Sequence, residues 1–471
     1  MPTALPIRPL ALSLAVSASL GFAPVAQADF LYGRLIPGPG TEAAGSSTDV
    51  DVSADGRTVV FASTAQNWVG DTYNGTRAIA LDLDTGVVEA VSVSGASMIR
   101  GEAPVVSGDG RYVAFLTHGS SFGPAWQVLR KDRETGALEL ASANSAGQPP
   151  ANGTQDNTVS ISADGRYIAF QTDAVLAESV DGAGDASPTG SSGIVYVKDM
   201  ATGQVEVASI TSTGAQGTCS LERHALSGNG RYLAMLCSTA MVPGATSGQA
   251  YVRDLQANTT ELASRSATAT SGSNAFVYRP AMSPGGRFMT FQTRGYGGLG
   301  YANGVGSEGN SGVYLRDRQT DTTIAIPRPT DIPESAYDSC SVSAVSDIAS
   351  VLLSCNHAWG GGSSYPQVFL FIPDAGAPGM LSVAGNQPGN SSSGDTSAVN
   401  ASGLSMAWES TATNIDPTDG NGASDIFVLV EESVLSDAIF IDGFEAAPPA
   451  NVAGGRARIA RVSGSEVTLV D

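Results

Sequence analysis

The side chains best suited to chemistry stand near the C-terminal end of the chain, in a run of oxygen-bearing residues among glycines. Asp416, Asp419, Asn421 and Asp425 recur at short spacing in the segment DPTDGNGASD. Hard cations prefer oxygen ligands at such spacing, so the run predicts a calcium site, although it lacks the glutamate at the twelfth position of an EF-hand loop. A partial copy, GDTYNG at residues 70–75, favours a turn of the fold instead. Both interpretations stay open, and no other cofactor is expected.

The four cysteines predict two disulfide bonds. Cys219 with Cys237, and Cys340 with Cys355, each bracket a pair of predicted strands in similar contexts, TCSLERH…LCS and SCSVSAV…SCN. Adjacent antiparallel strands bring such residues within disulfide distance, and an oxidising compartment would keep the bonds formed. A zinc site is disfavoured, because no C-x-x-C pair occurs and the three histidines are scattered.

Catalytic motifs are scarce. The chain has no G-x-S-x-G nucleophile elbow. Five aspartates recur where a predicted strand meets a short polar turn, which favours turn caps over a shared catalytic device. These are Asp82, Asp132, Asp199, Asp254 and Asp317. The alternative is a carbohydrate-active hydrolase or lyase with two carboxylates near the axis of a ring, for which the sequence selects no particular pair.

The elements that position these residues come from an internal repeat. VSADGRTVVF around Gly56 returns near Gly110, Gly165, Gly230 and Gly286, and two degenerate copies follow near Asp347 and Gly403. An Asp-Gly pair between two runs of strand formers predicts a tight hairpin, since glycine readily adopts positive φ. Later in each unit comes a third strand that ends in an aspartate, followed by a short polar turn and a fourth strand. Each unit therefore has four strands. Seven such units, 54 to 65 residues apart, predict an all-β, seven-bladed β-propeller of four-stranded antiparallel blades.

The repeats resemble the TolB-like β-propeller family, whose hallmark is the unit S-x-D-G-R-x-x-A-F followed by a strand with an aspartate and a Thr-Gly turn. The likeness is good in the first five units, as in ISADGRYIAF and YVKDMATGQV, and poor in the last two. It implies the propeller fold but no activity, since relatives include periplasmic interaction proteins and the gating propellers of peptidases. TolB itself has an additional N-terminal domain that these repeats do not imply here.

The ends of the chain predict how the ring closes. The seventh unit has a third strand at DIFVLV, residues 425–430, but no fourth strand of the usual kind. FLYGRLIP, residues 30–37, stands where a fourth strand would end, so we expect this N-terminal strand to complete the last blade and remove an open edge.

Three segments follow from this pattern. Residues 1–28 read as a signal peptide, with Arg8, an apolar run and a small-residue cleavage site. Residues 29–436 form the propeller. Residues 437–471 form a tail whose DAIFIDGFE motif resembles a near-terminal signature of exported proteins of some Gram-negative bacteria. The tail is expected to be either a sorting element or an edge strand docked on the ring.

The long loops predict the binding surface. In a four-stranded meander they open on one face, and aromatic residues gather in them: Trp68, Tyr73, Trp126, Tyr296, Tyr301, Trp359 and Tyr365. Exposed aromatics suit a protein, peptide or glycan site. The alternative is that they pack beneath their own loops. The leading hypothesis is therefore a non-catalytic binding protein, with an enzyme less favoured.

Composition narrows the partners. Without Arg8 of the signal, 23 basic and 45 acidic residues leave a net charge of −22. Such a surface repels phosphate backbones, so nucleic acid is not expected as a partner. No later segment is apolar enough over about 18 residues to cross a bilayer. We expect an exported monomer, periplasmic or extracellular, whose partner is an envelope or extracellular protein, peptide or glycan.

Overall fold

The computed structural model describes most of the chain from residue 30 to residue 435, together with residues 461–463 and 466–468. Residues 39–40, 120, 124, 155–158, 177–192, 267–271, 274, 295–298, 300–310, 328–339, 356–364, 374–377 and 385–386 lie outside this description. The predicted signal peptide and the DAIFIDGFE motif also lie outside it.

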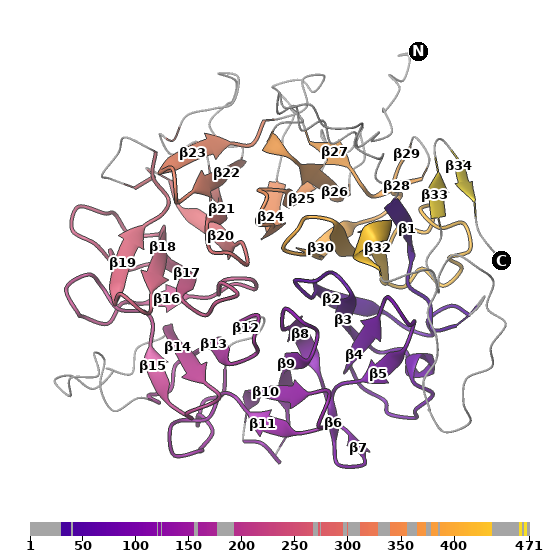
Figure 1. Ribbon diagram of the computed structural model, residues 1–471, viewed down its shortest axis with the longest axis horizontal. Helices are drawn as coiled ribbons and strands as arrows, with labels where there is room; N and C mark the ends of the chain where they lie inside the picture. Colours follow the sequence, from indigo (N-terminus) through magenta and orange to yellow (C-terminus); the bar gives the residue numbers. More distant parts are fainter. Residues whose placement is uncertain are drawn as a thin grey trace.

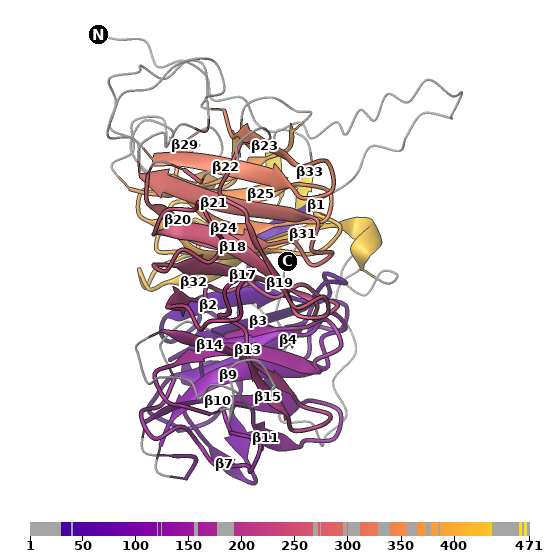
Figure 2. The ribbon, with the colours of Figure 1, turned by 90° about the vertical axis from the view of Figure 1, so that its left-hand side faces the viewer.

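Seven antiparallel sheets, here called blades 1 to 7, stand around a common axis (Figure 1), so the predicted seven-bladed propeller is confirmed. Six of them have four strands, and the seventh has four strands extended by two from the C-terminal tail. The side view shows strands running roughly along that axis (Figure 2). The strands of blades 1 to 3 are β2 (Ser47–Val52), β3 (Thr58–Ser63), β4 (Arg77–Asp82) and β5 (Val88–Ala90); β8 (Glu102–Val106), β9 (Tyr112–His118), β10 (Trp126–Asp132) and β11 (Leu138–Leu140); and β12 (Val159–Ile161), β13 (Tyr167–Thr172), β14 (Ile194–Asp199) and β15 (Val205–Val207).

The strands of blades 4 to 6 follow in the same order from the axis outward. They are β16 (Cys219–Ser220), β17 (Tyr232–Cys237), β18 (Gln249–Asp254) and β19 (Thr259–Leu262); β20 (Val277–Met282), β21 (Phe288–Arg294), β22 (Ser311–Asp317) and β23 (Thr322–Ala325); and β24 (Cys340–Val345), β25 (Val351–Cys355), β26 (Gln367–Phe371) and β27 (Gly379–Met380). Two small hairpins, β6 (Val93–Ser94) with β7 (Ser97–Met98) and β28 (Val383–Ala384) with β29 (Gln387–Pro388), and the short 3-10 turns η1 (Gln66–Trp68) and η3 (Glu432–Val434), lie in connections.

Blade 7 combines both ends of the propeller. Its order is β30 (Ser393–Val399), β31 (Ser405–Ser410), β32 (Asp425–Glu431) and then β1 (Phe30–Arg34). Strand β1 pairs antiparallel with β32 along its whole length, from Phe30 opposite Glu431 to Arg34 opposite Phe427. The predicted N-terminal closing strand is therefore confirmed.

A piece of the C-terminal tail extends blade 7 outward. Strand β33 (Arg461–Ser463) pairs with β1 at Leu31 and with β34 (Glu466–Thr468). This pairing is the arrangement expected of a docked edge strand, and the sorting role stays a prediction. At Leu31, β33 covers the outer edge that β1 would otherwise expose.

The repeated S-x-D-G-R letters each have a structural task, illustrated by blade 3. The Ser162 hydroxyl, which is buried, donates to Asp164 Oδ1 at 2.5 Å and accepts from the Tyr167 N–H at 2.9 Å. Asp164 Oδ1 also accepts from the Arg166 N–H at 3.0 Å, and Gly165 has φ of +68°. The side chains thus satisfy the turn's backbone donors, while glycine supplies the left-handed conformation.

These turns link each blade to the next by a hydrogen bond in one direction around the axis. Five links join backbone groups: Asp55 N to Gly108 O (3.0 Å), Gly108 N to Ala163 O (2.8 Å), Ala163 N to Gly228 O (2.7 Å), Gly228 N to Pro284 O (2.6 Å) and Asp347 N to Ala401 O (2.9 Å). Pro284 has no N–H, so Gly285 N donates to Asp347 Oδ1 at 2.5 Å. Asn400 Nδ2, 3.4 Å from Ala54 O, completes the circle.

Aromatic side chains tighten the same contacts. A Cβ built on Gly165 would lie 2.2 Å from Cδ2 of Tyr112 in the preceding blade, and one on Gly230 would lie 2.3 Å from Cδ2 of Tyr167. Arg166 in turn covers the Tyr167 ring at 4.9 Å. The turn glycine is therefore required twice, for its positive φ and for the close approach of the neighbouring blade.

In two blades a disulfide bond joins the innermost strand to the second strand. Cys219 bonds Cys237 and Cys340 bonds Cys355, each pair directly opposite in the ladder, with Cα atoms 4.0 and 4.1 Å apart. Both predicted pairings are confirmed. In blade 4 the inner strand β16 has only two residues, so the covalent bond supplements a short ladder.

We predict that Gly165→Ala lowers the melting temperature far more than Gly203→Ala. Gly203 also has positive φ, +77°, but nothing lies within 4 Å of its built Cβ, so its substitution costs about 1 kcal/mol for the backbone alone. At Gly165 the clash with Tyr112 adds about 1–3 kcal/mol. Calorimetry of the two variants measures the difference, and equal melting temperatures would contradict the proposed blade contact.

Candidate functional site

The closing strand delivers one buried arginine to the junction between blade 7 and blade 1. Arg34 is the last residue of β1, and the Leu35 N–H continues the pairing by donating to Ile426 O at 2.8 Å. Its side chain is only 3 % exposed. An arginine at such a site requires acceptors for its donors, because an unpaired buried charge is strongly destabilising.

Carboxylates from both ends of the propeller surround this guanidinium. Arg34 Nε donates to Asp416 Oδ2 at 2.8 Å, and Nη1 donates to Asp425 Oδ2 at 2.9 Å and to Glu42 Oε1 at 3.0 Å. Asp419 Oδ1 lies 3.7 Å from Nη1. We call these five residues the closure cluster. Glu42 belongs to the segment that leads into blade 1, whereas the three aspartates belong to the loop and strand β32 of blade 7.

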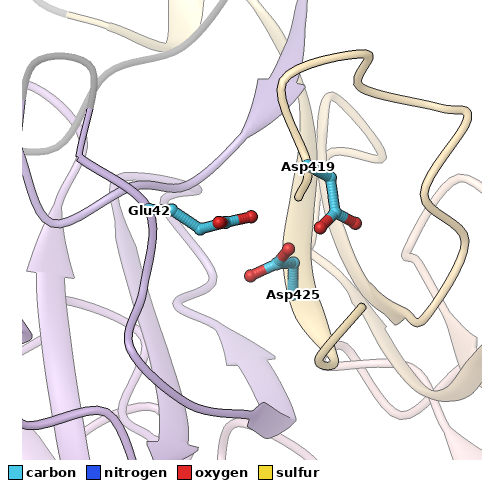
Figure 3. A group of neighbouring side chains, drawn as sticks. All are labelled: Glu42, Asp419 and Asp425. Carbon is cyan, nitrogen blue, oxygen red and sulfur yellow. The ribbon is translucent and has the colours of Figure 1, made fainter. Parts of the chain in front are cut away.

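Three of the carboxylates converge on one another (Figure 3). Glu42, Asp419 and Asp425 each place a carboxylate oxygen within 4.8 Å of the other two. Four carboxylates against one guanidinium leave an excess of negative charge. Burial raises the pKa of Asp425 to about 6 even though Arg34 bonds it, and burial also raises the pKa of Asp419.

The carboxylates that converge are only partly those predicted as calcium ligands. Asp419 and Asp425 lie together, as expected, but their third companion is Glu42. Asp416 is committed to Arg34 and to the Thr418 hydroxyl at 2.7 Å. Asn421 is committed to backbone groups, donating to Ala43 O at 2.8 Å and accepting from Ala423 N at 2.5 Å.

A second polar cluster crosses the propeller axis from blade 4. His224, which has φ of +55°, places Nε2 2.9 Å from Asp51 Oδ1 of blade 1 and Nδ1 3.4 Å from Ser343 O of blade 6. Arg223 Nη2 donates to Pro104 O of blade 2 at 2.6 Å and to Asp49 O at 3.2 Å. The pair thus spans the axis and ties blade 4 to three other blades.

Asp51 is fully engaged by this contact. Besides His224 it accepts from the Val52 N–H at 2.8 Å and the Val106 N–H at 2.9 Å. Burial opposes its ionisation, but His224, Arg223 and the Val106 N–H together hold its pKa below the usual value. A carboxylate bound in this way has a structural role.

The axial cavity beside it is small. It has a volume of about 70 Å³ and is lined from all seven blades, mainly by small and apolar residues, with Asp51 its one acidic lining residue. Glu409 of β31 does not line this cavity, but its buried carboxylate reaches the inner strands of blades 1 and 7, where it accepts from Asp49 N at 3.0 Å and Thr396 N at 3.2 Å. Burial, with the nearby charges of Asp49 and Asp395, raises the pKa of Glu409 to about 7.

The predicted aromatic residues do not form one cluster. Trp68 is 1 % exposed, packs edge-on against Phe61 at 4.9 Å and donates Nε1 to Ser47 Oγ at 3.3 Å. Trp68 therefore packs beneath its own loop. The prediction that Trp68 is exposed is wrong, because the η1 turn places the indole in the core of blade 1. Tyr73 is half-buried, with Arg77 5.7 Å from its ring centre.

The remaining aromatics lie on other blades. Trp126 is half-buried between His118, at 5.5 Å, and Arg100, at 5.0 Å. Tyr365 is 46 % exposed in the loop before β26. Tyr296, Tyr301 and Trp359 lie outside the described residues.

The five repeated aspartates cap turns, and four also bind arginine. Asp132 Oδ1 accepts from the Glu134 N–H at 2.9 Å, and Arg111 bonds both its oxygens at 3.1 and 2.8 Å. Hydrogen bonds from Arg111 hold the pKa of Asp132 well below its usual value. Asp199, Asp254 and Asp317 repeat the arrangement, and Asp82 caps Thr85.

Comparisons with known proteins add likenesses of fold. No protein-family model and no curated protein matches the chain. Solved structures with a similar fold include TolB from Acinetobacter baumannii, 15 % identical over 70 % of this chain and 79 % of that one, with a TM-score of 0.33. An oligogalacturonate lyase from Vibrio parahaemolyticus is 11 % identical over 86 % of this chain and 94 % of that one, with a TM-score of 0.44. The propeller domain of the Trilobed protease from Pyrococcus furiosus is 10 % identical over 82 % of this chain and 95 % of that one, with a TM-score of 0.47.

At such low identities and TM-scores, the fold assignment rests on the strand order and pairing given above. In the part of the chain that the structure describes, no helix is long and apolar enough to cross a membrane.

We predict that Arg34→Gln destabilises the protein by about 3–5 kcal/mol, because it leaves several buried carboxylates without their cation. Arg57→Gln is the matched control: Arg57 is partly exposed, lies 3.5 Å from a single carboxylate, Asp84, and donates Nε to Val434 O at 2.9 Å, so its loss should cost about 1 kcal/mol. Denaturant unfolding of both variants measures this. Similar losses in the two variants would show that the closure cluster contributes no more than a surface ion pair.

Proposed function

We propose that the chain is an exported, non-catalytic propeller of the TolB-like repeat type that binds a protein, peptide or glycan through the face carrying the long loops. The supporting observation is the distribution of exposed aromatic side chains. Among the described residues, Phe276 is 63 % exposed, Tyr365 46 % and Tyr278 37 %, and no other aromatic residue is among the large exposed hydrophobic side chains.

All three belong to the same face. Phe276 is in the connection between β19 and β20, Tyr278 is near the start of β20, and Tyr365 is in the connection between β25 and β26. These connections open at the end of the ring opposite the Asp-Gly turns. Blades 5 and 6 are neighbours, so the three side chains share one sector of that face. Exposed aromatics are typical of recognition surfaces, since each ring offers a large contact area at low entropic cost.

The axis supports binding over the alternative of a carbohydrate-active hydrolase or lyase. That alternative needs two available carboxylates about 5–10 Å apart facing a deep axial pocket. The axial cavity holds about 70 Å³, and Asp51 on its wall is engaged by His224 and two backbone N–H groups. Contacts that cross the axis favour a rigid support for a surface site.

Export is part of the proposal. The two disulfide bonds support it, because such bonds persist in oxidising compartments. The predicted signal peptide and the acidic surface agree with a partner in the envelope or outside the cell that is not nucleic acid.

We predict that Phe276→Ala, Tyr278→Ala and Tyr365→Ala combined weaken ligand binding at least 10-fold. Ligands would be selected with the wild-type chain from a displayed peptide library and a glycan array, and their Kd values measured by calorimetry. Losing three aromatic contacts removes about 1.4 kcal/mol or more, which is tenfold in affinity. The control is Val87→Ala with Ile348→Ala, two exposed apolar residues in turns of the opposite face.

Equal affinity of the aromatic variant and wild type, or a similar loss in the control, would place the site elsewhere. Turnover of any glycan on the array by the wild-type chain would contradict the non-catalytic assignment.

A further inference from the structure

We propose that Glu42, Asp419 and Asp425 bind one divalent cation, with Ca²⁺ the best fit, and that this cation fastens the N-terminal segment to the last blade. The proposal is independent of the ligand-binding face. Its starting observation is the convergence of three carboxylates within 4.8 Å of one another (Figure 3).

A second observation points to a bound cation. The Asp419 side chain is only 1 % exposed, and its buried Oδ2 receives no hydrogen bond from any N–H or O–H donor in the described residues. Within the cluster only a proton shared with the Glu42 carboxylate would pair it. Its other oxygen, Oδ1, takes only a 3.4 Å contact from the Gly422 N–H and lies 3.7 Å from Arg34. A buried carboxylate oxygen without a partner costs substantial free energy, which a bound cation would remove.

The neighbouring carboxylates have oxygens to share. The hydrogen bonds recorded for Glu42 in the described residues use Oε1, which accepts from Arg34 Nη1, Gly420 N and Asn421 N. Asp425 uses Oδ2, which accepts from Arg34 at 2.9 Å. Glu42 and Asp425 therefore each keep one oxygen that receives no hydrogen bond in the described residues, so both can join Asp419 as ligands while Arg34 keeps its contacts.

Charge and ligand type select the ion. The cluster carries four carboxylates, including Asp416, against one guanidinium, so it favours a cation of charge two over one of charge one. All the ligands are oxygens, and they come from an irregular loop and a connecting segment. Ca²⁺ tolerates such irregular oxygen shells at 2.3–2.6 Å, whereas Mg²⁺ requires near-octahedral geometry and retains several waters.

The cation would act on ring closure. Glu42 follows β1 in the chain, whereas Asp425 begins β32, the strand that β1 pairs with. A shared ion therefore bridges segments almost 400 residues apart in sequence, next to the Arg34 contacts that already join them. Because the unfolded chain cannot assemble these ligands, binding stabilises the closed ring by mass action.

The test is calorimetric unfolding of the chain in EDTA and in millimolar CaCl₂, with isothermal titration of CaCl₂. We expect Ca²⁺ to raise the melting temperature of the wild type by at least about 2 °C and to bind in a 1:1 ratio at this site. Asp419→Asn should lose both effects. Asp71→Asn should keep both, because Asp71 is a loop carboxylate that pairs with Arg77 in the partial sequence copy and belongs to no group of converging carboxylates in the described residues. If Asp419→Asn does not fold, Glu42→Gln takes its place.

Two results would overturn the proposal. One is a wild-type melting temperature that does not respond to Ca²⁺, or that responds equally to MgCl₂ or to NaCl of matched ionic strength. The other is an undiminished Ca²⁺ response in Asp419→Asn or Glu42→Gln. Reduced hydrogen exchange of residues 30–35 on adding Ca²⁺, absent in Asp419→Asn, would support the link to closure.

Discussion

The structure depends on closing the ring, because each blade can bury its two apolar faces only against a neighbour on either side. Hydrogen bonds between the turns that join the first two strands of successive blades run in one direction around the axis and link every blade to the next. Strand β1 supplies the outer strand of blade 7, so the first and last segments of the propeller share one sheet. An open ring would expose an apolar face and a sheet edge at once.

The charged residues inside the fold serve the same constraint. Arg34 joins β1 to carboxylates of blade 7, and the Arg223–His224 pair joins blade 4 to blades 1, 2 and 6 across the axis. Both clusters lie where chain segments distant in sequence meet. With its interior fixed in this way, the propeller offers a rigid frame on which the long-loop face, with Phe276, Tyr278 and Tyr365, can vary.

Local sequence predicted the repeating features and missed the convergent ones. The turn residues and strand spacing within each unit predicted the hairpins, the blades and both disulfides. Counting the strands of the incomplete last unit predicted the closing strand. The closure cluster could be predicted only in part: Asp419 and Asp425 are close in sequence, but Glu42 and Arg34 reach them only through closure. Arg34 gave a signal, as a single charge within an otherwise uncharged closing strand. Trp68 was ambiguous because a loop tryptophan can pack beneath its own loop, as it does here.

The central claim is that β1 is an integral strand of a closed ring. Hydrogen exchange followed by mass spectrometry tests it directly, by comparing amides of residues 30–34 with those of β31, residues 405–410, in the same blade. A closed ring predicts that both segments exchange slowly and through the same cooperative opening, with a common dependence on denaturant. Exchange of residues 30–34 that is orders of magnitude faster, while β31 stays protected, would contradict it.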